Sequence, residues 1–265
     1  MQLGIKNKNF ALFGGSRGIG WAAACALAED GANVFLLSRF PERYQEKASK
    51  LATLNNVSVK SEKCDVTDEL SVEKAVMNLL KQCDQIHGVA ITTHSEAHGP
   101  SFTKMTDSDW EDKYQDVLMG SIRPCRKLIP HMIEMGGGSI VLTSAFSAHS
   151  PSNSLFAYAS QKAALINVTK NLAQTYGEVG IRTNCVCPGY TKTSRAEERL
   201  EKITRNGASS KAEAETILID NTHMKIGLNR LGEPREIGDV IAFLLSERAS
   251  YTSGAVICVD GAASV

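Results

Sequence analysis

Short apolar runs alternate with longer helical stretches along this chain. A run of consecutive apolar positions is typical of a strand buried on both faces, because neighbouring strand side chains point to opposite sides of a sheet. Helical stretches of ten or more residues between such runs are the connections that parallel strands need. The pattern therefore predicts a doubly wound, Rossmann-like α/β fold, a parallel sheet with helices on both faces. The predicted strands lie at residues 10–13, 34–37, 57–59, 87–91, 140–142, 182–186 and 256–259, and the clearest helices at 107–119 and 156–176.

The same alternation continues to the end of the sequence, so we expect one domain over residues 1–265. One stretch breaks the alternation. Residues from about 193 to 225 are rich in charge and alanine and lie between two apolar strand runs, which predicts a helical insertion at the surface. Two interpretations are open for this insertion: a lid over a bound nucleotide, or a solvated helix pair without a function.

The composition is typical of a soluble globular protein. Hydrophobic residues make up 43% of the chain and charged residues 22%, and no apolar run is long enough to span a bilayer. Basic and acidic residues balance at 29 each, so there is no excess positive charge to bind nucleic acid or an anionic membrane. The first residues lack the apolar core of a secretion signal, and we expect a cytoplasmic protein.

Two groups of residues raise the question of a metal site. The seven cysteines are scattered and form no Cys-x-x-Cys pair, and Cys185 and Cys187, which alternate on a predicted strand, are expected to be packing residues. His94, Glu96 and His98 could bind a metal, but polar loop residues at the mouth of a substrate site are favoured. His94 is a further candidate for orienting the substrate or relaying a proton. We expect no metal.

A glycine-rich turn follows the first predicted strand and leads into an alanine-rich helix. Glycine has no Cβ, so backbone N–H groups and the helix N-terminus can approach a pyrophosphate. The strand before and the helix after are the context of a dinucleotide-binding turn, although the spacing differs from Gly-x-Gly-x-x-Gly. The turn predicts cofactor contacts from Gly14, Ser16, Arg17, Gly18, Ile19 and Gly20.

The end of the second predicted strand indicates which dinucleotide binds. An acidic residue about 20 positions after the glycines would bind the ribose hydroxyl of NAD, whereas an arginine accommodates the 2′-phosphate of NADP. This chain has Ser38 and Arg39 at that position, and Arg17 in the glycine turn adds a second positive charge. Either arginine alone is also consistent with a solvated surface residue. Together they predict NADP(H) as the cofactor.

Tyr158 and Lys162 are the candidate reactive pair. They lie four residues apart in a segment of good helix formers, so they share one face of a helix. A phenol has a pKa near ~10, and a neighbouring ammonium favours the phenolate. On spacing alone, a surface aromatic residue beside a solvated lysine accounts for the pair at least as well.

Several short motifs occur in a fixed order that covers nearly the whole chain. They are Gly14-x3-Gly18-x-Gly20, Asp65-Val66, Tyr158-x3-Lys162, Pro188-Gly189 with Thr193, and an ending from Arg230-Leu231-Gly232-Glu233-Pro234 through Gly254 to Asp260-Gly261. Each motif is short, but their joint order and spacing are specific. The chain resembles the short-chain dehydrogenase/reductase family, and more closely its 3-oxoacyl-carrier-protein-reductase-like members.

The resemblance implies an oxidoreductase that moves a hydride between NADP(H) and a carbonyl or secondary-alcohol carbon of a small molecule. Tyr158 would be the general acid/base at the substrate carbonyl, and Lys162 would lower the pKa of Tyr158 and hold the nicotinamide ribose. The resemblance also implies a homotetramer or homodimer. It implies contacts to the adenine for Asp65 and Val66, and to the nicotinamide end of the cofactor for Pro188, Gly189, Thr191 and Thr193.

Three positions depart from the family pattern. Residues 91–94 are Ile-Thr-Thr-His where Asn-Asn-Ala-Gly is usual, and Val117 replaces a helix asparagine that often completes a proton relay. Thirteen residues before Tyr158 the chain has Ala145 in place of the serine that binds the substrate oxygen. A one-residue difference in the loop would bring Ser144 into that place, so we predict Ser144 as the third catalytic residue. Another serine follows Ala145 two positions later.

These departures keep two alternatives open. One is a catalytically impaired NADP(H)-binding sensor or scaffold with the same fold, although retention of Tyr158 and Lys162 favours an enzyme. The other is an alcohol dehydrogenase that works in the oxidative direction. The substrate is not defined by these motifs, because it contacts loops in which a family likeness constrains the sequence least.

Overall fold

The computed structural model describes residues 2–93, 96–150, 154–221 and 225–264. Within these residues, seven parallel strands form one sheet: β1 (Asn9–Phe13), β2 (Asn33–Ser38), β3 (Val59–Lys63), β4 (Gly88–Ile91), β5 (Gly138–Thr143), β6 (Ile181–Pro188) and β7 (Val256–Val259). Their order in the sheet is β3-β2-β1-β4-β5-β6-β7. Successive strands are therefore added in one direction from β1 to β3 and in the opposite direction from β4 onward, and the boundary between β1 and β4 is where doubly wound folds bind their ligands.

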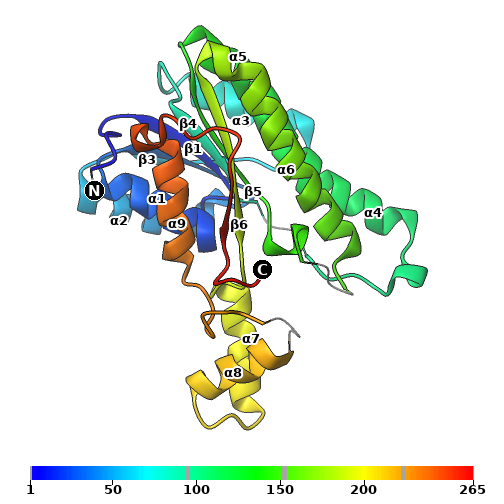
Figure 1. The fold of residues 1–265 in the computed structure, drawn as a ribbon. Helices are drawn as coiled ribbons and strands as arrows, with labels where there is room; N and C mark the ends of the chain where they lie inside the picture. The colour runs from blue at the N-terminus through cyan, green and yellow to red at the C-terminus, as the bar shows by residue number, and fades with distance from the viewer. Residues whose placement is uncertain (1, 94–95, 151–153, 222–224, 265) are drawn as a thin grey trace.

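Helices connect the strands on both faces of the sheet. They are α1 (Gly18–Glu29), α2 (Gln45–Asn55), α3 (Glu69–Leu80), α4 (Asp107–Lys113), α5 (Gly120–Glu134), α6 (Phe156–Tyr176), α7 (Ser194–Arg205), α8 (Lys211–Asn221) and α9 (Pro234–Leu245). One buried cluster joins α1, α2 and α9 to one face of the sheet, and a second joins α3, α5 and α6 to the other (Figure 1). The predicted Rossmann-like fold with helices on both faces is confirmed.

Two elements differ from their predicted bounds by more than two residues at one end. The strand predicted at 57–59 is β3, which begins at Val59 and runs to Lys63; it is an edge strand with polar side chains, so it lacks a continuous apolar run. The helix predicted at 107–119 is the first part of a longer helical run. α4 continues into a π-helical turn, η3 (Tyr114–Met119), and then into α5.

α7 and α8 occupy the stretch predicted as a helical insertion. In Figure 1 they project below the sheet, beyond the carboxyl end of β6. They carry a small apolar core of their own, which includes Leu200, Ala214, Leu218, Ile219, Ile226 and Leu231. None of the helices within the described residues has the length and apolarity needed to cross a membrane.

Candidate active site

The glycine turn after β1 is packed too closely for side chains. A Cβ on Gly20 would lie 2.3 Å from Thr92 Oγ1 and 2.4 Å from the carbonyl oxygen of Gly14. Gly14 has a φ of +84°, and a Cβ there would lie 2.8 Å from the backbone of Thr92. Only glycine is compatible with these positions. The close packing places the N-terminus of α1 at the carboxyl edge of the sheet, where a helix N-terminus favours a phosphate.

The other predicted cofactor contacts lie in the glycine turn, at the start of α1 and at the end of β2. Ser16 is buried in the turn, Ile19 packs against the core under α1, and Arg17 is exposed just before α1. Ser38 ends β2, the neighbour of β1, and the exposed Arg39 follows it, its guanidinium 5.9 Å from the Phe40 ring. Exposed arginines therefore follow the ends of β1 and β2, and Ser38 stands where an acid would select NAD.

Asp65 and Val66 follow β3 at the same edge of the sheet. An oxygen of the Asp65 carboxylate accepts hydrogen bonds from the Thr67 amide at 3.0 Å and the Thr67 hydroxyl at 2.8 Å. The Val66 carbonyl accepts one from Arg123 Nη1 at 3.0 Å, and Arg123 is only 8% exposed. Arg123, on α5, thus holds the backbone of Val66, a contact that the sequence pattern did not predict. Its neighbours one helical turn later, Arg126 and Lys127, are also basic, so the local pattern does not distinguish it.

Tyr158 and Lys162 lie on one face of α6, as their spacing predicts. The Lys162 ammonium is 5.6 Å from the centroid of the Tyr158 ring and donates a hydrogen bond of 2.6 Å to the Thr143 carbonyl at the end of β5. Lys162 is only 4% exposed, and this burial lowers its pKa to about 8. Burial also raises the pKa of Tyr158, the direction opposite to the lowering that the sequence analysis expected from Lys162. At neutral pH the pair is a protonated phenol beside an ammonium.

The end of β5 gives Ser144 a structural partner. Its hydroxyl donates a 2.7 Å hydrogen bond to the carbonyl of Lys162, and the residue is 2% exposed. The hydroxyl is thus bonded to the backbone of α6, which does not support the predicted contact with a substrate oxygen. Ala145 follows in extended conformation, and Ser147 comes next in the short 3-10 helix η4 (Phe146–Ala148). Ser147 Oγ is buried and has no hydrogen-bond partner among the described residues.

Two of the departures from the family pattern pack within the fold. The Thr92 hydroxyl donates a 3.0 Å hydrogen bond to the Phe13 carbonyl, which ties the end of β4 to β1 beside the glycine turn. Val117 is 4% exposed within the apolar cluster under α3, α5 and α6; its side chain has no polar atom, and its carbonyl accepts a hydrogen bond from Ser121 Oγ at 2.8 Å. A proton relay through the side chain at this position is therefore excluded.

The segment after β6 meets the glycine turn. A Cβ on Gly189 would lie 2.6 Å from the Cα of Asp260, so the chain passes close to the end of β7 there. Pro188 ends β6, and the Thr191 hydroxyl donates to the Gly189 carbonyl at 3.0 Å. Thr193 precedes α7, and its Cγ2 would be 3.1 Å from a Cβ on Gly18. The turn predicted for the pyrophosphate and a residue predicted for the nicotinamide end thus lie next to each other.

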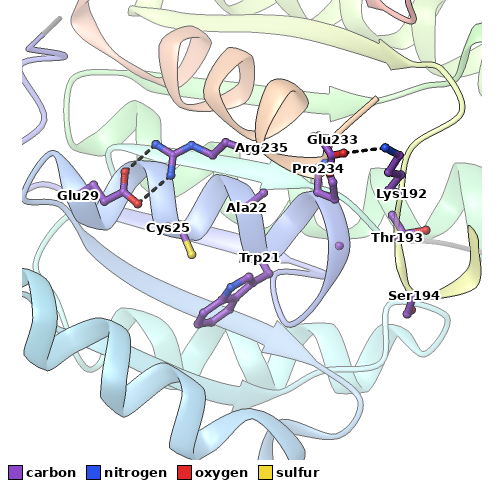
Figure 2. Close-up of a pocket in the computed structure, with 11 residues that line it drawn as sticks. Trp21, Ala22, Cys25, Glu29, Lys192, Thr193, Ser194, Glu233, Pro234 and Arg235 are labelled. Atoms are coloured by element: carbon purple, nitrogen blue, oxygen red, sulfur yellow. Dashed lines mark hydrogen bonds and ion pairs between the residues drawn. The ribbon is translucent and has the colours of Figure 1, made fainter. Parts of the chain in front are cut away.

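A cleft of about 440 Å³ lies beside this meeting point (Figure 2). α1 forms one wall and the segments before α7 and α9 form the other. Arg235 bridges the walls with two hydrogen bonds to the Glu29 carboxylate, at 2.7 and 2.6 Å. Tyr158 and Lys162 are not among the residues that line the cleft. The lining side chains are Trp21, Ala22, Cys25, Glu29, Lys192, Thr193, Ser194, Glu233, Pro234 and Arg235.

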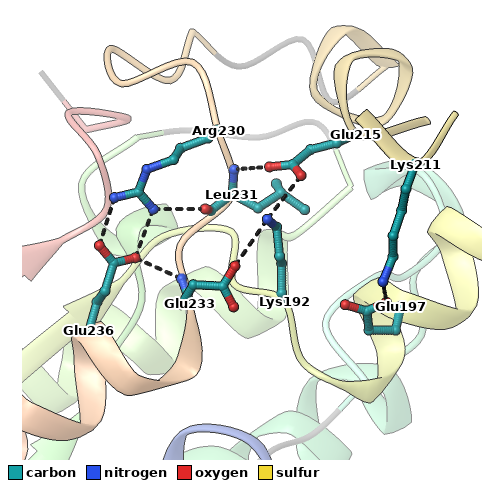
Figure 3. A network of polar contacts seen from close by, with 8 residues as sticks. All are labelled: Lys192, Glu197, Lys211, Glu215, Arg230, Leu231, Glu233 and Glu236. Atoms are coloured by element: carbon teal, nitrogen blue, oxygen red, sulfur yellow. Dashed lines mark hydrogen bonds and ion pairs between the residues drawn. The ribbon is translucent and has the colours of Figure 1, made fainter. Parts of the chain in front are cut away.

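A polar network anchors the insertion to the rest of the domain (Figure 3). Lys192 Nζ lies 3.0 Å from a carboxylate oxygen of Glu215 on α8 and 3.0 Å from one of Glu233 before α9. Hydrogen bonds to these two carboxylates raise the pKa of Lys192. Glu215 also accepts a 2.7 Å hydrogen bond from the amide of Leu231. α8 is therefore bonded to residues on both sides of the insertion, before α7 and before α9.

Of the loop residues His94, Glu96 and His98, the structure describes Glu96 and His98, and each of these contacts a different partner. Glu96 forms an ion pair with Arg195 of α7. His98 Nδ1 lies 3.1 Å from Ser154 Oγ, and burial lowers the pKa of His98. His94 lies outside the described residues. The loop after β4 is thereby connected to the insertion through Glu96.

Comparison with known proteins identifies the class of this chain. It is a dinucleotide-dependent oxidoreductase. Residues 14–263 match the family model described as Enoyl-(Acyl carrier protein) reductase. Dehydrogenase/reductase SDR family member 4 of Oryctolagus cuniculus is 33% identical over 263 residues, covering 98% of this chain and 94% of the relative. The chain belongs to the short-chain dehydrogenase/reductase family.

Two solved structures of reductases are similar over nearly the full chain. The structure of L-sorbose reductase from Gluconobacter frateurii, complexed with NADPH and L-sorbose, has a TM-score of 0.90 and 28% identity, covering 100% of this chain and 99% of that one. The NADPH-dependent 3-quinuclidinone reductase from Rhodotorula rubra has a TM-score of 0.84 and 29% identity, covering 98% and 92%.

Proposed function

We propose that this protein is an NADP(H)-dependent reductase of ketones or 3-oxoacyl-type carbonyl compounds. The observation that carries the proposal is the position of the partly buried Tyr158 beside the buried Lys162. Lys162 is bonded to the carboxyl end of β5, and the glycine turn follows the carboxyl end of β1 in the same parallel sheet. A proton donor and a dinucleotide-binding turn therefore share one sheet edge.

The residues present are compatible with NADP(H). The glycine turn leaves no room for a Cβ at Gly14 or Gly20, as a close approach of backbone to a pyrophosphate requires. Arg17 and Arg39 are exposed at the ends of neighbouring segments and would bind the 2′-phosphate. NADPH supplies the hydride when it is bound. Both similar solved reductases are named with NADPH, which supports the same choice here.

Proton transfer is assigned to Tyr158. Because burial raises its pKa, the phenol is protonated at neutral pH and donates its proton to the carbonyl oxygen as that oxygen gains negative charge. The phenolate that remains is stabilised by the Lys162 ammonium beside the ring. Lys162 is held in place by the Thr143 carbonyl. The remaining proposed cofactor contacts are Asp65, Val66, Pro188, Gly189, Thr191 and Thr193.

Ser147 is the proposed donor to the substrate oxygen, in place of Ser144. The Ser144 hydroxyl is bonded to α6, and Ala145 has no polar side-chain atom. Ser147 Oγ is buried and without a partner within the described ranges, and a buried unpaired hydroxyl costs roughly 1–3 kcal/mol. A ligand oxygen would satisfy this hydroxyl. Ser147 lies on η4, which begins directly after Ala145, so it is two residues from the position of the usual serine.

The insertion that contains α7 and α8 is proposed as a lid within a single domain of 265 residues. It begins at Thr193, whose methyl group packs against Gly18 of the glycine turn. The Glu96–Arg195 ion pair also connects it to the loop after β4. Movement of α7 would therefore change access to the cofactor and to the substrate together.

A second candidate function is an NADP(H)-binding sensor or scaffold. It is favoured by Val117 and Ala145, which replace two polar residues of the usual relay with apolar ones. A third candidate is an alcohol dehydrogenase that works in the oxidative direction. A homotetramer or homodimer and a cytoplasmic location also remain predictions, and analytical ultracentrifugation would test the oligomeric state.

The test of catalysis is NADPH oxidation with a panel of ketones and 3-oxoacyl thioesters, followed by absorbance. Tyr158→Phe should lower kcat/KM by at least about 100-fold with little change in NADPH affinity, since a positioned acid typically contributes 10²–10⁴-fold. Tyr176→Phe, at the other end of α6, is the matched control and should keep wild-type activity.

The same assay separates the candidates. Tight NADPH binding without turnover in either direction would favour the sensor. Faster turnover of alcohols with NADP⁺ than of the matched ketones with NADPH would favour the dehydrogenase. NADH that supports turnover as efficiently as NADPH, by kcat/KM, contradicts the cofactor assignment.

A further inference from the structure

Three potential metal ligands from separate segments meet beside the end of β6. Cys187 on β6 is the register partner of Cys258 on β7, and His149 directly follows η4. The ligand atoms of the three residues all lie within 4.8 Å of one another, and Cys187 Sγ is 3.7 Å from His149 Nε2. Cys187 is buried, whereas His149 and Cys258 are exposed, so an ion can reach the cluster from solvent.

The geometry of the cluster is close to that of a zinc site. Zn²⁺ binds thiolate sulfur at about 2.3 Å and imidazole nitrogen at about 2.0–2.1 Å, and tetrahedral angles then separate a sulfur from a nitrogen by roughly 3.6 Å and two sulfurs by roughly 3.8 Å. The Cys187–His149 distance of 3.7 Å already has this value. Contraction of the remaining separations from within 4.8 Å requires only side-chain adjustment, and Cys258 and His149 are at the surface.

We propose that His149, Cys187 and Cys258 bind one Zn²⁺ ion per chain, with a fourth coordination position open to solvent. Two thiolates and an imidazole are a soft donor set that selects zinc over magnesium or calcium. Binding displaces the two thiol protons, so the two thiolates cancel the charge of the ion. No acidic residue is needed for this balance.

The site borders the proposed active site without overlapping it. Cys187 immediately precedes Pro188 and Gly189, and His149 follows Ser147 by two residues. The proposed zinc site differs from the Cys185–Cys187 pair considered from the sequence. Its second thiol, Cys258, and its imidazole, His149, come from other segments. The proposal rests on these three side chains alone and does not depend on the reductase activity.

The test uses the full-length protein, freed of metal and kept reduced with a phosphine. Titration with Co²⁺ should give the thiolate-to-cobalt charge-transfer absorption of a tetrahedral site, saturating at one ion per chain, and Zn²⁺ should abolish this absorption by displacement. Cys258→Ser and His149→Ala should each weaken Zn²⁺ binding by at least about 100-fold, since even loss of an outer partner of a ligand costs 10–100-fold.

Both substituted side chains are exposed, so these variants should fold, and thermal unfolding would confirm it. Cys25→Ser, which removes a thiol from α1, is the matched control and should bind Zn²⁺ like the wild type. A wild-type protein without the cobalt–thiolate absorption overturns the proposal. Equal Zn²⁺ affinity in the wild type and in Cys258→Ser also overturns it. Neither result bears on NADPH oxidation, which is measured separately.

Discussion

The glycine turn and the reactive centre lie at the same edge of the sheet but are built in different ways. In the turn the backbone itself is the site, and a Cβ at Gly20 would collide with Thr92 and with the Gly14 carbonyl. In the proposed reactive centre the chemistry is carried by side chains of η4 and α6, and β5 contributes a backbone carbonyl. The chain keeps the turn and departs from its family at Val117 and Ala145. A site made of backbone excludes substitution, whereas one made of side chains can exchange donors within the same fold.

The largest effect is expected when the turn is filled. In Gly20→Ala the new Cβ would lie 2.3 Å from Thr92 Oγ1 and 2.4 Å from a backbone oxygen. We expect a loss of about 2–3 kcal/mol in the free energy of unfolding, as for other overpacked sites, together with loss of measurable NADPH binding. Denaturant unfolding and a fluorescence titration with NADPH measure the two effects.

Gly177→Ala is the control for this substitution. Nothing lies within 4 Å of a Cβ at Gly177, and its φ of −60° suits any residue. It should leave both measurements unchanged. If Gly20→Ala behaved like Gly177→Ala, the turn would tolerate a side chain, and the contrast between a backbone-built turn and a side-chain-built reactive centre would be wrong.

The next largest effect concerns the hydroxyl that binds the substrate oxygen. Ser147→Ala should lower kcat by about 100-fold, since loss of one donor to a developing oxyanion costs 10²–10³-fold. Ala145→Ser in that background should restore much of the rate by returning a serine to the usual position. Ser144→Ala should cost about 1 kcal/mol of stability through the lost bond to Lys162 and change kcat little. A strong loss of kcat in Ser144→Ala alone would restore the original prediction for Ser144.

A smaller effect is expected at the cofactor phosphate. Arg39→Ala should lower kcat/KM for NADPH by about 10-fold or more, because a hydrogen bond to a charged group contributes about 1.5–3 kcal/mol. The value for NADH, which lacks the 2′-phosphate, should not change. Lys50→Ala removes another exposed cation, paired with Glu46 on α2, and should change neither value. Parallel losses with both cofactors would assign Arg39 a structural role instead.

The smallest effect is a change in pH dependence. Burial lowers the pKa of Lys162 to about 8, so its ammonium is present below that pH and is lost as the pH rises through it. Reduction by the wild type should therefore decline above about pH 8, whereas the protonated Tyr158, whose pKa is raised, adds no decline there. Lys162→Arg keeps its charge and should lose the decline. Lys170→Arg, an exposed position on α6, should keep it; a decline in Lys162→Arg would exclude Lys162 as its source.

Local signals were sufficient for the fold class and for half of the candidate site. Consecutive apolar runs predicted the sheet. They misplaced only the polar edge strand β3, because an edge strand needs no apolar run. The glycine turn and the shared helix face of Tyr158 and Lys162 depend on residues near one another in sequence. Steric limits and the helical repeat act over such short spans, so the sequence alone determined them.

Long-range contacts decided the rest. The hydroxyl of Ser144 is directed at the α6 backbone while that of Ser147 is left without a partner, and neither orientation is visible in a serine-rich loop sequence. The pKa of Tyr158 rises because of burial, which depends on every segment packed around it. His149, Cys187 and Cys258 come together only where η4, β6 and β7 meet. Position and desolvation are properties of the packed chain, and therefore only the tertiary structure decided them.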